Sequence, residues 1–148
     1  MNERKTIKAY CDGSYSDKSP YPNKSGWGVL FENGEHYSGQ VDWLGMRQIH
    51  GEVHAVIQAC RIAMNMEVHL LRIFYDYKGM EEWASQKWKA NNEVTKNFQK
   101  LFKVKDGKIY YGTENDDHLM EVRFIKVAAK DNKADDLATR AIGIKSVH

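Results

Sequence analysis

The chain has 148 residues, a formal net charge of +2 and two cysteines, Cys11 and Cys60. This length predicts a single domain over residues 1–148 that buries its own core, and two cysteines are too few for a disulfide framework. No segment approaches the roughly 18 consecutive apolar residues of a membrane span, and the opening MNERKTIKAY lacks the apolar run of a secretory signal. These features favour a cytoplasmic protein with free thiols and no membrane contact.

The first third of the chain predicts three strands. Residues 6–14 alternate apolar and polar side chains and stop at Gly13, as a strand does before a turn. Residues 26–33 and 34–43 have the character of two further strands, and Asn33-Gly34 between them is a strong hairpin signal. We therefore expect the sheet to open with an antiparallel hairpin.

The rest of the chain alternates between helices and strands. Apolar residues recur at helical spacing through residues 47–64, and a short apolar run at residues 69–76 is typical of a buried strand. Further along, the pattern predicts helices at Met80–Trp88 and Glu93–Lys103, an irregular loop or short hairpin over residues 104–118, a strand over residues 119–127 and a last helix from about Asn132 to Ala141. This order predicts an α/β fold, with a mixed sheet and helices on its faces.

Four acidic residues from distant segments fall at the ends of predicted elements. Asp12 ends the first strand, Glu52 lies in the first turns of the first helix, Asp76 ends the fourth strand, and Asp135 lies in the first turn of the last helix. Ligand sites in open α/β sheets lie at strand ends, so these residues could converge at one edge. Clustered carboxylates repel unless a cation lies between them, and oxygen ligands select Mg²⁺ or Mn²⁺. Two such ions roughly 4 Å apart suit in-line displacement at phosphorus.

Each of these positions also has an ordinary structural explanation. Asp12 begins a common turn sequence, Glu52 suits the dipole at a helix start, and Asp76 can simply end a strand. Asp135 could complete, with Asn132, an imperfect capping box. No position is specific by itself, so the metal-site hypothesis depends on their joint placement.

Histidine and basic residues add weaker signals. His50 and His54 flank Glu52 but share a helical face with each other, which favours surface or packing roles over metal binding. Residues 87–108 contain seven lysines against two acidic residues. This stretch suits a phosphate backbone, although a solvated helix face is the commoner explanation. Trp83 has the spacing of a core residue, whereas Trp88 lies between two lysines and could stack on nucleic acid.

Four segments, in their order along the chain, resemble type 1 ribonuclease H. They are YCDGSY with SGWGVLFEN, MRQIHGEVHAVIQA, IFYDYKGMEEWASQKWKAN and NKADDLATRAI. The third resembles a viroplasmin-associated-like subgroup common in Gram-positive bacteria. The resemblance covers nearly the whole chain and implies a ribonuclease H-like fold, with a five-stranded mixed sheet, an antiparallel hairpin at its start and helices on both faces.

The resemblance also implies an activity and its residues. The activity is metal-dependent endonucleolytic hydrolysis of the RNA strand of RNA–DNA hybrids with two Mg²⁺ or Mn²⁺ ions, and no obligatory protein partner is evident. The catalytic and metal-ligand roles map onto Asp12, Glu52, Asp76 and Asp135. Contacts to the 2′-OH groups of RNA map onto backbone groups at Gly13, Ser14 and Tyr15 and onto Gln48, where the family often has Asn. The family's basic grip on the DNA strand maps onto Lys87, Trp88, Lys89 and Lys96.

Two features depart from the family pattern. Residues 104–118 form a longer segment than the subgroup leads us to expect, and the shorter loop before the last helix lacks the histidine that many members carry there. Lys130 or Asp131 could assist in its place, and His118 could reach in from the preceding segment. A catalytically weak or silent hybrid-binding domain and a DNA-acting nuclease of the same superfamily are the alternative hypotheses.

Overall fold

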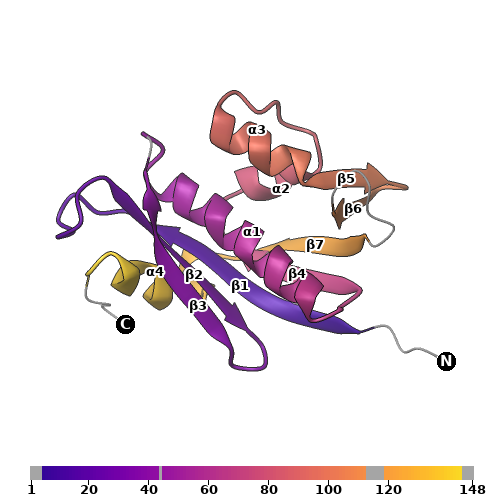
Figure 1. Cartoon of the computed structure of the whole chain (residues 1–148), viewed down its shortest axis with the longest axis horizontal. Coiled ribbons are helices and arrows are strands. Elements are labelled where there is room, and N and C mark those ends of the chain that lie inside the picture. Colours follow the sequence, from indigo (N-terminus) through magenta and orange to yellow (C-terminus); the bar gives the residue numbers. More distant parts are fainter. Residues whose placement is uncertain (1–4, 44, 113–118, 145–148) are drawn as a thin grey trace.

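The computed structural model describes residues 5–43, 45–112 and 119–144 (Figure 1). The strands are β1 (Thr6–Ser14), β2 (Lys24–Phe31), β3 (His36–Asp42), β4 (Leu70–Tyr75), β5 (Phe102–Lys105), β6 (Lys108–Tyr111) and β7 (Met120–Lys126). The helices are α1 (Gln48–Asn65), α2 (Gly79–Ala84), α3 (Glu93–Lys100) and α4 (Asp135–Ala141), with a 3₁₀ turn η1 (Ala129–Asp131).

One mixed sheet contains all the described strands, in the order β3-β2-β1-β4-β7-β6-β5 (Figure 1). The antiparallel hairpin that the sequence predicted is formed by β2 and β3, and β1 pairs antiparallel with β2. In the centre, β1 pairs parallel with β4, and β4 pairs parallel with β7. The predicted α/β fold with a mixed sheet is therefore confirmed.

The predicted number of five strands is wrong, because the described residues alone form a sheet of seven. The two additional strands, β5 and β6, form a hairpin at the edge of the sheet beside β7. Asp106 and Gly107 both adopt positive φ values, 52° and 75°, which is the geometry that a tight hairpin turn requires. Phe102 anchors this hairpin in the core, since its ring packs against Phe98, Tyr111 and Phe124.

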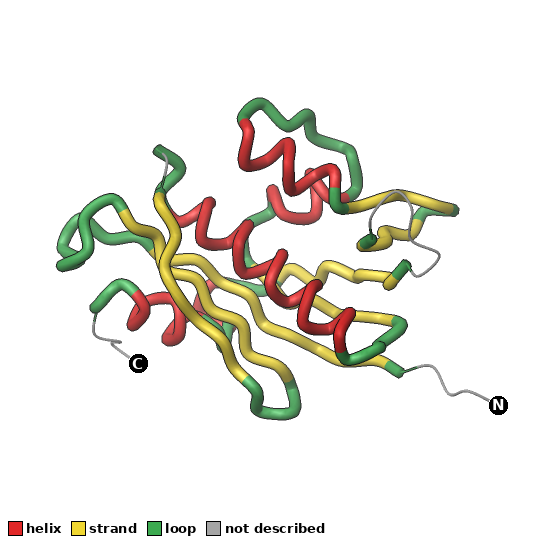
Figure 2. Tube along the Cα trace, in the orientation of Figure 1, coloured by secondary structure: helices red, strands yellow, loops and turns green. Residues whose placement is uncertain are grey.

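Helix boundaries also differ from the prediction. The predicted helix Met80–Trp88 is shorter, because Gln86 adopts a left-handed φ of 70° and the Lys87 N–H donates back to the Glu82 carbonyl. The next helix begins at Glu93 as predicted, with an Asn92–Thr95 capping box, but ends at Lys100. The chain then turns into β5, and Figure 2 shows α2 and α3 stacked beside this edge of the sheet.

The two faces of the sheet are covered unequally. On one face, α1 buries its small residues Ala55, Ala59 and Ala63 against the central strands. On the other face, α4 packs against β1, β2 and β3. Among the described residues, no helix combines the length and apolarity that crossing a membrane requires.

The first turns of α1 lie directly on the strands because glycine lines the contact. A Cβ on Gly51 would overlap the carbonyl oxygen of Gly26, and a Cβ on Gly13 would overlap the backbone of Glu52. The close packing of α1 on the strands therefore determines the position of the Glu52 side chain. Any side chain at either glycine must move α1 away from the sheet.

We predict that Gly51→Ala lowers stability by about 1–3 kcal/mol, the usual cost of overpacking. Thermal unfolding measures the change, and Arg61→Ala, at an exposed position on the same helix, is the matched control. Equal melting temperatures for the two variants would show that the close approach is not needed.

Candidate metal centre

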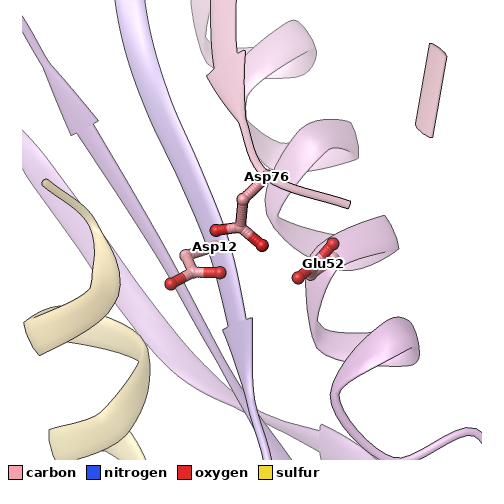
Figure 3. Close-up of side chains that lie close together, drawn as sticks. All are labelled: Asp12, Glu52 and Asp76. Atoms are coloured by element: carbon pink, nitrogen blue, oxygen red, sulfur yellow. The ribbon is translucent and has the colours of Figure 1, made fainter. Parts of the chain in front are cut away.

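Three carboxylates from distant parts of the chain meet at one edge of the sheet. Asp12 comes from β1, Glu52 from α1, and Asp76 from the residue that follows β4 (Figure 3). One carboxylate oxygen from each lies within 4.8 Å of the others. Asp12 and Glu52 are buried, with 4% and 6% of their surfaces exposed, and Asp76 is half-buried.

The parallel pairing of β1 and β4 brings the two aspartates together. Tyr10 and Phe74 are directly paired, and each aspartate lies two residues farther along its own strand. Both side chains therefore emerge at the same end of the sheet and on the same face. Asp12 is held by its neighbour, because the Gly13 N–H donates to Asp12 Oδ1 over 2.9 Å.

Asn132 is a buried residue that links these strands to the segment before α4. Its side-chain NH₂ group donates to the Cys11 carbonyl at 2.8 Å and to Asp76 Oδ2 at 2.9 Å. Its side-chain oxygen accepts from the Ala134 N–H at 3.1 Å. Asn132 thus fixes Asp76 relative to β1.

The interpretation of Asn132 and Asp135 as a capping box is therefore wrong. The helix begins at Asp135, its N-cap is Ala134, and no side chain caps it. The role of Asn132 agrees with its chemistry, because an amide side chain carries both donors and an acceptor and so suits a buried link between segments.

Asp135 approaches the three carboxylates from a fourth element without joining their group. Its charge contributes to raising the pKa of Asp12, so the two carboxyl groups lie near each other. It lines a small cavity of about 170 Å³ together with Lys130, Lys133 and Asp136. The structure thus places Asp135 beside the cluster, whereas Asp12, Glu52 and Asp76 form it.

Burial and mutual repulsion dominate the electrostatics of this cluster. Desolvation, followed by the charge of Asp76, raises the pKa of Asp12 to about 9. Desolvation, then the charges of Asp76 and Asp12, raises the pKa of Glu52 to about 10. Glu52 Oε2 is buried with no hydrogen-bond partner. A hard cation between the three groups would relieve both the repulsion and the unsatisfied oxygen, so the donor set fits a divalent metal ion.

The residues predicted to contact the RNA strand lie beside this cluster. Gly13 and Ser14 end β1, and Gln48 begins α1 with its carbonyl against Gly13. Tyr15 stacks on Trp43, with ring centroids 5.1 Å apart and planes within 10°. Neither Trp43 nor this stack was singled out from the sequence, because aromatic residues 28 positions apart carry no local pattern.

The residues predicted to bind the DNA strand lie in two separate places. Lys87, Trp88 and Lys89 lie in the connection between α2 and α3, and with Trp83 they line a cavity of about 440 Å³. The side chain of Trp88 is 38% exposed and meets Trp83 edge to face. Trp83 packs against the core as predicted. Lys96 lies exposed on α3, outside the lining of this cavity.

The two histidines near Glu52 make other contacts. His50 Nδ1 contacts the Asp42 carbonyl, and the His54 ring packs against Trp27 with centroids 4.9 Å apart. These contacts support packing roles for both. In the segment before α4, Lys130 and Asp131 belong to η1 and are exposed, and His118 lies outside the described residues.

Comparison with proteins of known structure finds the same fold. An RNase H1 from the halophilic archaeon Halobacterium salinarum aligns with a TM-score of 0.62 and 19% identity, over 92% of this chain and 96% of that one. LC11-RNase H1, isolated from compost and solved with an RNA/DNA hybrid, aligns with a TM-score of 0.63 and 17% identity over 92% and 96%. The N-terminal RNase H domain of Rv2228c from Mycobacterium tuberculosis gives 0.63 and 13% over 93% of each chain.

No curated protein matches the sequence. The RNase H family profile, in contrast, matches residues 4–143, which is well over half of the chain. The profile match includes all four acidic residues and the segments that connect them. The chain therefore belongs to the ribonuclease H family.

Proposed function

We propose that this protein is a divalent-metal-dependent endonuclease that hydrolyses the RNA strand of RNA–DNA hybrids. The observation that carries the proposal is the group formed by Asp12, Glu52 and Asp76, in a chain of the ribonuclease H family. The RNA/DNA hybrid bound to the structurally similar LC11-RNase H1 supports the choice of substrate.

Asp12, Glu52 and Asp76 would hold the metal, with Asp135 completing the ligand set. Bound Mg²⁺ or Mn²⁺, two ions in our proposal, would neutralise charge at the phosphodiester and activate water for in-line attack. The chain's own groups keep the ligands in place: the Gly13 N–H holds Asp12, and Asn132 holds Asp76. Backbone groups at the half-buried Gly13, Ser14 and Tyr15 and the exposed side chain of Gln48 would contact the ribose 2′-OH groups that distinguish RNA from DNA.

A panel of labelled substrates tests the proposal directly. RNA–DNA hybrid, double-stranded RNA and duplex DNA are each incubated with Mg²⁺, with Mn²⁺ and with EDTA. We expect cleavage only of the RNA strand of the hybrid, and only with a divalent cation. Tight hybrid binding without cleavage would identify a silent binding domain instead, and cleavage of duplex DNA would identify a DNA-acting nuclease.

We predict that Asp76→Asn abolishes hybrid cleavage but leaves the fold intact. The amide is nearly isosteric with the carboxylate but lacks the charge that holds a cation. Removing one charge from the cluster should also raise the melting temperature in EDTA, since it relieves repulsion. Asp106→Asn, in the exposed turn between β5 and β6, is the matched control. Parental cleavage rates for Asp76→Asn would contradict the site assignment.

Metal-free protein should lose stability as the pH rises. The folded-state pKa values of Asp12 and Glu52, about 9 and about 10, lie above their ordinary values of 3.8 and 4.5. Between about pH 4 and 9 the folded protein therefore binds more protons than the unfolded chain. Its free energy of unfolding then declines as the pH rises, by at most about 1.4 kcal/mol per pH unit for each carboxyl.

Urea unfolding at pH 5, 6, 7 and 8 in EDTA measures this decline. Glu52→Gln should make it shallower, because the amide does not titrate. Saturating Mg²⁺ should raise stability most at pH 8, where proton release costs least. Metal-free stability that is constant or rising over this range would contradict the electrostatic account of the cluster.

We predict that Lys87, Lys89 and Lys96 contact phosphates without reading sequence. Replacing all three with Ala should reduce the slope of log K for hybrid binding against log salt by about 0.9 per lost contact. Binding is measured in EDTA to prevent cleavage, and Lys105→Ala, an exposed lysine on β5, is the control. An unchanged slope in the triple variant would show that these lysines are only solvated.

A further inference from the structure

The sheet face opposite α1 carries two rows of side chains that run across neighbouring strands, beyond the part of the face that α4 covers. Direct pairing aligns one row of apolar side chains across four strands: Leu30, Tyr10, Phe74 and Ile125. Two residues back on three of these strands, the same pairing aligns a basic row: Lys8, Arg72 and Arg123. Paired residues share a face, so both rows project from the same side as α4.

The basic row places like charges directly opposite one another, which is unfavourable in a sheet. Arg123 Nε has a carboxylate partner, since it donates to Glu121 Oε2 over 2.8 Å. Glu32 contacts the backbone N–H of Lys8 rather than its ammonium group. Within the described part of the chain, neither Lys8 nor Arg72 forms an ion pair. Lys8 and Arg123 are exposed and Arg72 is half-buried, so the row presents net positive charge, and a complementary surface would be acidic.

The apolar row indicates whether the acidic partner is a nucleic acid or a protein. The rings of Tyr10 and Phe74 stack on each other with centroids 4.9 Å apart, and Lys133 Nζ lies 5.5 Å from the centroid of Tyr10. Nucleobases bind such platforms by stacking on free ring faces. Here the Tyr10 ring already stacks on Phe74 and has the Lys133 ammonium group over it, and a phosphate backbone would leave the apolar row uncovered.

We propose that this face docks an extended, acidic segment of a partner protein. The two rows lie two residues apart on each strand, or about 6.6 Å. Side chains at positions i and i+2 of an extended peptide have the same spacing and point the same way. A segment with an acidic residue at i and an apolar residue at i+2 would thus meet the basic and apolar rows together. None of the residues in the two rows is among the proposed hybrid-binding residues, and the apolar row lies two residues before Asp12 and Asp76 on the same strands.

Fluorescence anisotropy with a labelled peptide of three Asp-Ser-Leu-Ser repeats tests the proposal. Arg72→Glu is the key variant, because it places an acidic residue between Lys8 and Arg123 and should preserve or raise the melting temperature. We expect Arg72→Glu to weaken peptide binding about tenfold or more. Lys105→Glu, an exposed lysine outside the rows, should bind as the parent does. Ile125→Thr should weaken binding several-fold through the apolar row.

Three controls test whether peptide binding depends on the two rows and not on the hybrid-binding site. A peptide with Ser in place of Leu should bind more weakly, and one with Lys in place of Asp should not bind. Cleavage of hybrid by Arg72→Glu should equal the parental rate. Absence of binding to the Asp-Ser-Leu-Ser peptide, or equal binding by the parent and Arg72→Glu, would overturn the proposal. If Arg72→Glu instead weakens binding of single-stranded oligothymidine, and the peptide does not bind, the face is a nucleic-acid surface and the proposal fails.

Discussion

Repulsion between three carboxylates at one sheet edge is the constraint on which the rest of the site depends. Asp12, Glu52 and Asp76 bring oxygens within 4.8 Å of one another, and two of the three groups are buried. Burial alone penalises a charged carboxylate, and a second nearby charge adds to the penalty. In the absence of a cation the cluster is most stable when protonated, whereas a hard divalent cation makes the charged state favourable.

The surrounding structure holds the carboxylates together against this repulsion. Glycine at positions 13 and 51 allows α1 to lie on the strands, which brings Glu52 to the ends of β1 and β4. Asn132 connects the Cys11 carbonyl to the Asp76 carboxylate and so ties the segment before α4 to the same edge. Ligands that are fixed before metal binding lose little further conformational freedom when the ion binds.

Much of this arrangement could be predicted from the sequence because it follows from strand and helix ends. Asp12 and Asp76 end apolar strands, and the parallel pairing of those strands brings them together. Other features depend on contacts between distant residues. The sequence predicts helix through Lys103 and a loop or short hairpin after it, whereas β5 begins at Phe102, because the Phe102 ring packs on residues from separate elements. The bond from Asn132 to Asp76 spans 56 residues and leaves no periodic pattern.

The most direct measurement of the central claim is anomalous diffraction from crystals soaked in Mn²⁺. Anomalous scattering locates Mn²⁺ independently of any assumption about activity. The account predicts Mn²⁺ density between the carboxylates of Asp12, Glu52 and Asp76, with Asp135 reaching the same ion or a second one. Ordered, separated carboxylates without Mn²⁺ density at saturating concentration would contradict it, as would Mn²⁺ bound only elsewhere on the protein.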